Sequence, residues 1–160
     1  MKSLKYLATI LLFSASTVFA GDIEEANAAF NKKDYITALK KFKSAALKND
    51  AIGQLQVGGM YNEGLGVVQD YAEAVRWYKL AAAQGNSTAQ LNLGKMHYNG
   101  QGVVQDYVRA HMWFNLSSVS GDADAVKKRN IAAGKMTPQQ IGEAQKMERE
   151  CQARNFKNCD

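Results

Sequence analysis

The chain has 160 residues, of which 46% are hydrophobic and 22% are charged, with a formal net charge of +5 at pH 7. This length and composition suit a single globular domain. The positive charge is mild, and lysine clusters such as Lys40 to Lys48 alternate with apolar positions at helical spacing, which is typical of solvated helix faces rather than of a nucleic-acid-binding patch. We therefore expect no nucleic-acid partner.

Residues 1–20 have the pattern of a secretory signal peptide. Lys2 and Lys5 precede an apolar run, and the small-residue segment that follows ends in V-F-A at Ala20. The apolar run is shorter than the roughly 20 residues of a membrane-spanning helix, and Gly21 stands where a lipid-carrying cysteine would be needed. We predict cleavage after Ala20, no stable membrane anchor on the mature chain, and a periplasmic or secreted location.

The two cysteines, Cys151 and Cys159, lie close together near the C-terminus. In an exported protein such a pair is typical of a disulfide. The alternative is a metal site, but two cysteines with no nearby histidine do not complete a tetrahedral ligand set. We predict a Cys151–Cys159 disulfide that holds the tail against the last helix, and no metal or other cofactor.

An eight-residue string occurs twice, 36 residues apart. It reads G-L-G-V-V-Q-D-Y at 64–71 and G-Q-G-V-V-Q-D-Y at 100–107, and 15 of 36 positions are identical at this offset. A fixed period of this size is typical of stacked helical repeats, in which each unit buries its apolar face only against its neighbours. The sequence predicts an all-α fold, an α-solenoid of antiparallel helix pairs.

The start of the second helix is similar in three units. Asp34, Asp70 and Asp106 recur every 36 residues and are each followed by Tyr, which predicts N-caps whose carboxylates accept the first free helix N–H groups. Asp70 and Glu73 suggest a carboxylate version of the capping box. Between the helices, the Gly-x-Gly steps beginning at Gly64 and Gly100 predict loops that use positive φ. Val67 and Val103 are expected to anchor these loops on the helices.

Large and small apolar residues alternate along the second helices, which predicts core packing rather than a ligand cage. We expect Trp77 in particular to be a core residue between stacked units. In the first helices Gly58 and Gly94 share one phase, and because glycine in a helix costs about 1 kcal/mol relative to alanine, they indicate close helix approach.

The repeat pattern decays after Gly121, which predicts a C-terminal capping helix. Residues 123–133 can form one more first helix, ended by Gly134. Thr137 is then an expected N-cap, followed by Pro138 at the first helical position and by Gln140 at the capping-box position, with the last helix running to about Arg154.

The stretch from Ala89 to Tyr107, continuing through Trp113 to Gly121, resembles the Sel1-like repeat, a relative of the tetratricopeptide repeat. The resemblance spans two units, Sel1-like repeats 51–86 and 87–122, and the segment before them is more similar to a tetratricopeptide hairpin. With the predicted signal peptide and cap, the chain has five parts: signal peptide 1–20, tetratricopeptide-like hairpin 21–50, the two repeats, and a helical cap 123–160. It implies an interaction scaffold, because such repeats serve mostly in protein–protein interaction.

In arrays of this kind the first helices line the concave face, and this locates a candidate site for a protein or peptide partner. The candidates are the residues just after the packed positions of these helices: Gly59, Asn62, Lys95, Tyr98 and Asn99. They differ between the two units although the scaffold positions agree, as expected of a recognition surface.

We expect no enzymatic activity. His97 and His111 are 14 residues apart and stand where the other unit has Tyr61 and Val75, so both are interpreted as packing or surface variants. No nucleophile or metalloprotease signature occurs. Some members of the family have been linked to β-lactam or cell-wall handling, so the alternative hypothesis is a hydrolase or binding protein acting on envelope glycan.

Overall fold

The computed structural model describes residues 21–159, so the predicted signal peptide lies outside the described residues. A helical segment at 21–31 is followed by seven helices, and the described residues contain no strand: α2 (Tyr35–Leu47), α3 (Ala51–Glu63), α4 (Tyr71–Ala82), α5 (Ser87–Asn99), α6 (Tyr107–Ser118), α7 (Ala123–Ala133) and α8 (Pro138–Ala153). The predicted all-α class is confirmed.

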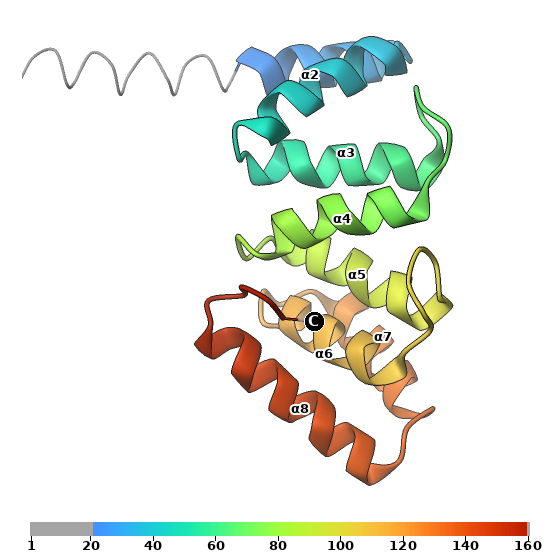
Figure 1. The fold of residues 1–160 in the computed structure, drawn as a ribbon, viewed down its shortest axis with the longest axis vertical. Coiled ribbons are helices and arrows are strands. Elements are labelled where there is room, and N and C mark those ends of the chain that lie inside the picture. Colours follow the sequence, from blue (N-terminus) through green and yellow to red (C-terminus); the bar gives the residue numbers. More distant parts are fainter. Residues whose placement is uncertain (1–20, 160) are drawn as a thin grey trace, which may run out of the picture.

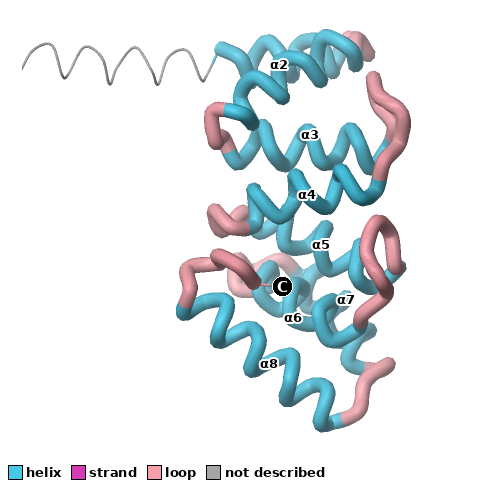
Figure 2. The backbone as a smooth tube through the Cα atoms, viewed as in Figure 1, coloured by secondary structure: helices cyan, strands magenta, loops and turns pink. Residues whose placement is uncertain are grey.

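The helices stack in chain order into one elongated array (Figure 1). From α2 to α7 each helix packs on the next one, and α8 packs back on α6. The short α2–α3 and α4–α5 turns lie on one edge of the array, and the long glycine loops α3–α4 and α5–α6 lie on the opposite edge (Figure 2). This is the predicted α-solenoid of antiparallel helix pairs.

The three aspartates cap the second helices as predicted. Asp34, Asp70 and Asp106 accept from the backbone N–H three residues ahead, at 3.1, 3.0 and 2.9 Å. The predicted capping box at Asp70 is wrong, because the Glu73 side chain does not accept from the Asp70 backbone N–H. The Glu73 carboxylate accepts instead from the Arg76 guanidinium and from the Trp77 indole, while Asp70 N–H donates to the Tyr61 carbonyl at 3.0 Å.

The glycine loops join neighbouring units. Gly66 and Gly102 have φ near +70°, and a Cβ at Gly66 would lie 2.5 Å from the Tyr35 carbonyl oxygen, which belongs to the second helix of the preceding unit. Gly102 meets the Tyr71 carbonyl in the same way. Only glycine fits both the positive φ and this backbone approach. Each loop therefore fixes the spacing between its own unit and the one before it.

The paired glycines of the first helices allow close helix approach, as predicted. A Cβ at Gly58 would lie 2.7 Å from the Tyr78 ring, and one at Gly94 would collide with the Phe114 ring. Both rings are buried, with 2% of their surface exposed. In α4 and in α6, an aromatic side chain thus fills the space left by the glycine of the preceding first helix.

The prediction that Trp77 is a core residue is wrong in degree. Its repeat equivalent Trp113 is 2% exposed, whereas Trp77 is only partly buried, at the edge of the N-terminal core cluster. The next apolar position behaves likewise, since Leu80 is 50% exposed and Leu116 is 3% exposed. The difference arises from the C-terminal cap, which covers α6 and leaves α4 open.

The cap has the predicted helices. Thr137 Oγ1 accepts from Gln140 N–H at 3.2 Å, and Gln140 Oε1 accepts from Thr137 N–H at 2.8 Å, which completes the capping box in front of Pro138. Cys151 and Cys159 form a disulfide. The tail after α8 returns toward α6 and the α4–α5 turn (Figure 1), where the Phe156 ring lies beside Gly85.

Candidate functional site

Two adjoining hollows lie along the first helices and together form what we call the α3–α5–α7 groove. The larger has a volume of about 180 Å³ and is lined by Lys95, Tyr98, Asn99, Phe114, Lys128 and Ile131. The smaller has a volume of about 120 Å³ and is lined by Asn62, Tyr78, Asn92, Lys95, Met96, Asn99 and Gln101. Because Lys95 and Asn99 line both, the hollows form one continuous surface.

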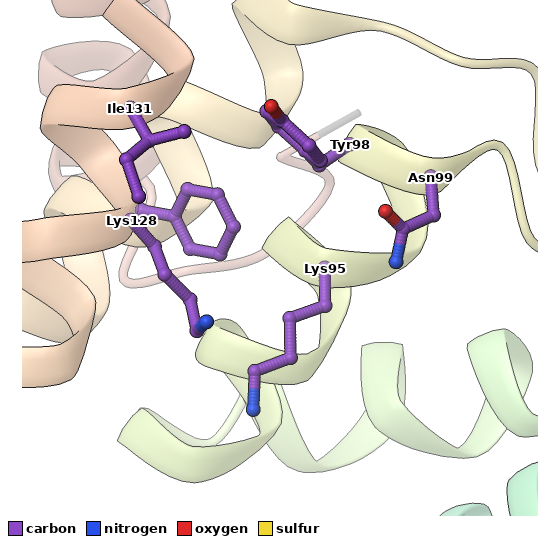
Figure 3. A pocket seen from close by; sticks show the side chains of 6 residues that line it. Lys95, Tyr98, Asn99, Lys128 and Ile131 are labelled. Carbon is purple, nitrogen blue, oxygen red and sulfur yellow. The ribbon is translucent and has the colours of Figure 1, made fainter.

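The larger hollow combines an apolar floor with two cationic side chains. Phe114 reaches it because Gly94 offers no side chain to block the ring, and Ile131 of α7 lines it as well. In the close view the Lys95 and Lys128 side chains extend in the same direction beside Tyr98 and Asn99 (Figure 3). The arrangement suits a ligand that carries both an apolar and an acidic group.

The charge at this hollow is only partly neutralised. Lys128 pairs with Asp124 one turn earlier in α7, at 3.5 Å, in an ion pair whose members are both partly exposed. Lys95 makes no ion pair with any residue in 21–159. A partly exposed ion pair such as Lys128–Asp124 contributes little to the stability of the fold, so the Lys128 ammonium can still meet an external carboxylate.

The loop glutamines hold the ends of the first helices that carry the site. Gln105 Nε2 donates to the Tyr98 carbonyl at 2.9 Å, and Gln69 Nε2 donates to the Asn62 carbonyl at 2.7 Å. The Tyr98 ring also packs against Tyr107, with centroids 5.2 Å apart. Sequence reasoning missed the glutamines, although their recurrence in both V-V-Q-D segments was a usable signal.

Comparison with known proteins identifies the repeating unit. The Sel1 repeat family matches residues 51–86 and 87–122. The chain contains two Sel1 repeats.

Two solved structures share this architecture. The Sel1 repeats and their flanking helices are similar to c5321, a protective antigen present in uropathogenic Escherichia coli strains that displays an SLR fold, with 28% identity, a TM-score of 0.82 and 88% of this chain covered. They are also similar to a Sel1 repeat protein from Oxalobacter formigenes, with 28% identity, a TM-score of 0.64 and 67% covered. The chain spans 31% and 44% of the lengths of these two proteins. No curated protein matches it.

Four of the five predicted site residues line the groove between the Sel1 repeats and α7: Asn62, Lys95, Tyr98 and Asn99. The fifth, Gly59, lies beside it, since a Cβ there would come within 3.9 Å of the Tyr78 hydroxyl. Lys128 and Ile131 were not predicted. Both lie on α7, beyond the matched Sel1 repeats, and only the packing of α7 on α6 brings them to the groove.

The buried ionisable groups of the Sel1 repeats have packing roles. His97 and His111 are 5% and 6% exposed, and burial, together with the positive charge of Arg129, lowers the pKa of His111. Burial and the negative charge of Glu63 raise the pKa of Tyr78 to about 12. Within residues 21–159, no group of three or more His, Cys, Asp or Glu side chains is placed to hold a metal ion, and no helix has the length and apolar character needed to cross a bilayer.

Proposed function

We propose that this protein is an exported Sel1 repeat scaffold that binds a protein or peptide segment in the α3–α5–α7 groove. The observation that carries the proposal is the larger hollow, where Lys95 and Lys128 flank a floor that contains Phe114. An apolar side chain of the partner fills the hollow over Phe114, and a neighbouring carboxylate meets the lysines.

The repeat comparison supports this assignment. The residues that hold the scaffold are the same in both Sel1 repeats, whereas Gly59, Asn62 and Glu63 are replaced by Lys95, Tyr98 and Asn99 at the equivalent positions. Tyrosine supplies a rigid amphipathic contact, and amides supply adaptable hydrogen bonds, as protein-recognition surfaces require. A non-enzymatic role is consistent with the packing of both histidines inside the array.

Export rests on the signal-peptide pattern of residues 1–20 and agrees with the Cys151–Cys159 disulfide, which belongs to an oxidising compartment. Mass spectrometry of the protein from its own cells tests it. Gly21 is the expected N-terminus, and an intact chain beginning at Met1 on the mature protein would overturn export.

A pull-down from the envelope fraction tests the groove. We expect the mature protein to capture its partner, and the double variant Lys95→Ala with Tyr98→Ala to lose that capture while its circular dichroism spectrum and melting temperature stay close to wild type. A matched control, Lys32→Ala with Leu47→Ala, removes an exposed lysine and an exposed apolar residue away from the groove and should retain capture. Capture that survives the groove variant would exclude the groove as the binding face.

A further inference from the structure

The second helices carry an apolar pair outside the groove, and the two Sel1 repeats treat this pair differently. In the second repeat Trp113 and Leu116 are buried, with 2% and 3% of their surface exposed. In the first repeat the equivalent Leu80 is 50% exposed, and Trp77 is partly buried. The pair is therefore fully covered on α6, whereas on α4 Leu80 is half exposed and Trp77 is covered only in part.

The covering on α6 is an amphipathic helix followed by its tail. Cys151 of α8 and Cys159 of the tail belong to the same buried cluster as Trp113 and Leu116, with Met147 and Phe156 packed against it. At the edge of this contact the Asn115 side-chain amide donates to the Glu148 carboxylate of α8. A helix with a stripe of small and medium apolar residues and flanking carboxylates thus fits a Sel1 second helix.

The open surface on α4 has two depressions, and one of them extends to the tail that covers α6. A depression of about 270 Å³ is lined by Glu73, Arg76, Trp77, Lys79 and Leu80. Another, of about 210 Å³, is lined by Lys79, Leu80, Ala83, Trp113, Phe156, Asn158 and Cys159. The two depressions share Lys79 and Leu80, so the open face of α4 directly adjoins the tail that follows α8. The Trp77 indole is held in place by its hydrogen bond to Glu73, at 3.0 Å.

The array does not require apolar residues at the positions of Trp77 and Leu80. In α2, the positions equivalent to Trp77 and Leu80 are Lys41 and Ser44. Lys41 pairs with Glu25, and the Ser44 hydroxyl donates to Asp22 at 2.9 Å, so the helical segment 21–31 meets a polar face there. An array of this kind can therefore carry polar residues at these positions. Packing against the N-terminal core accounts for part of the Trp77 side chain, but the half-exposed Leu80 and the open edge of Trp77 need another explanation.

We propose that the face of α4 around Trp77 and Leu80 binds an amphipathic helix of another protein, in the way that α8 covers α6. This helix has small and medium apolar residues on one stripe and carboxylates beside it, because Arg76 and Lys79 stand where α6 has Met112 and Asn115. The surface is separate from the α3–α5–α7 groove, so this second interface does not depend on the function proposed above.

The probe is a fluorescein-labelled synthetic peptide with the sequence of residues 138–153 and Cys151→Ala, added to the mature protein with its disulfide intact. The tethered α8 keeps its own place on α6, because its effective concentration is far higher than that of the added peptide. We expect saturable binding by fluorescence anisotropy. Leu80→Glu and Leu80→Ser should weaken it by about tenfold or more, as loss of a central apolar contact does.

Two controls distinguish binding at this interface from binding in the groove and from nonspecific hydrophobic binding. Leu47→Glu changes an apolar residue of α2 that is 79% exposed and should leave binding intact, as should Lys95→Ala with Tyr98→Ala. Circular dichroism and thermal melting verify that each variant is folded. Absence of saturable binding, or binding that Leu80→Glu and Leu80→Ser leave unchanged, overturns the proposal. A Leu80-dependent dimer in sedimentation velocity also overturns it, because the occupant would then be a second copy of this chain.

Discussion

The two Sel1 repeats share 15 of 36 residues, yet they meet different neighbours. Both use a glycine under an aromatic ring, an aspartate cap and the same loop, so their backbones are alike. The second repeat is followed by α7, α8 and a disulfide-closed tail, which bury Trp113 and complete the groove, while the outer face of the first repeat stays open. In a solenoid, the role of a repeated residue therefore depends on what packs against its unit.

The tryptophan pair gives the largest expected difference between the repeats. Trp113→Ala should lower the free energy of unfolding by about 3 to 5 kcal/mol, because it empties a buried site in the core. Trp77→Ala should cost clearly less, since solvent already reaches part of that side chain. Urea unfolding of both variants measures the two losses. Equal losses would show that Trp77 is as buried in solution as Trp113.

Removing the disulfide tests how far the C-terminal tail contributes to the burial of Trp113 in the second repeat. Cys159→Ser opens a loop closed by two cysteines eight residues apart, and we expect a loss of roughly 2 to 3 kcal/mol of unfolding free energy. In a Trp77→Phe background, the emission of Trp113 should also shift to longer wavelength as the tail lifts from α6. Unchanged emission would show that α8 covers Trp113 without help from the tail.

Tyr78 and Phe114 fill the same position, so Tyr78→Phe makes the first repeat like the second. The pKa of Tyr78 is raised to about 12 in the folded state, so the stability linked to the neutral phenol is complete below pH 10 and is lost as pH rises toward 12. The loss should reach about 1.4 kcal/mol by pH 11. Urea unfolding at pH 8 and pH 11 should show a smaller drop for Tyr78→Phe than for wild type, and an equal drop would place this titration elsewhere.

The smallest expected effect comes from His111, which stands where the first repeat has Val75. Burial and Arg129 lower its pKa in the folded state, so protonation favours the unfolded chain and stability declines as pH falls through and below 6.5. His111→Val should flatten the dependence of unfolding free energy on pH below about 6.5. The same slope in both proteins would mean that His111 is accessible to protons in the folded state.

The local features of each unit were determined by the sequence itself. Helix caps at Asp34, Asp70 and Asp106, positive φ in the glycine loops and the capping box before Pro138 were all predicted, because each depends on groups within a few residues of one another. The predicted hydrogen bond from the Asp70 backbone N–H to the Glu73 carboxylate does not form, because the Glu73 carboxylate accepts from the Trp77 indole instead. The 36-residue period was enough to predict the stacking of the units.

The candidate site was only half predictable. Asn62, Lys95, Tyr98 and Asn99 follow from their phase on the first helices, and they do line the groove. Lys128 and Ile131 come from α7, where few residues still match the repeat; the 36-residue offset gives Ile131 the phase of Lys95, but the predicted candidates come only from the two repeats. Their positions depend on how α7 packs on α6.

Only the tertiary structure decided which copy of the apolar pair on the second helices is buried. Trp77 and Trp113 are identical in local sequence phase, and burial differs because α8 returns to α6 and brings Cys151, Cys159 and Phe156 over one of them. Burial is a property of contacts between residues far apart in the chain, whereas caps and turns are properties of neighbours. A repeat period describes the units, and the surroundings of each unit are set by the packing of the whole array.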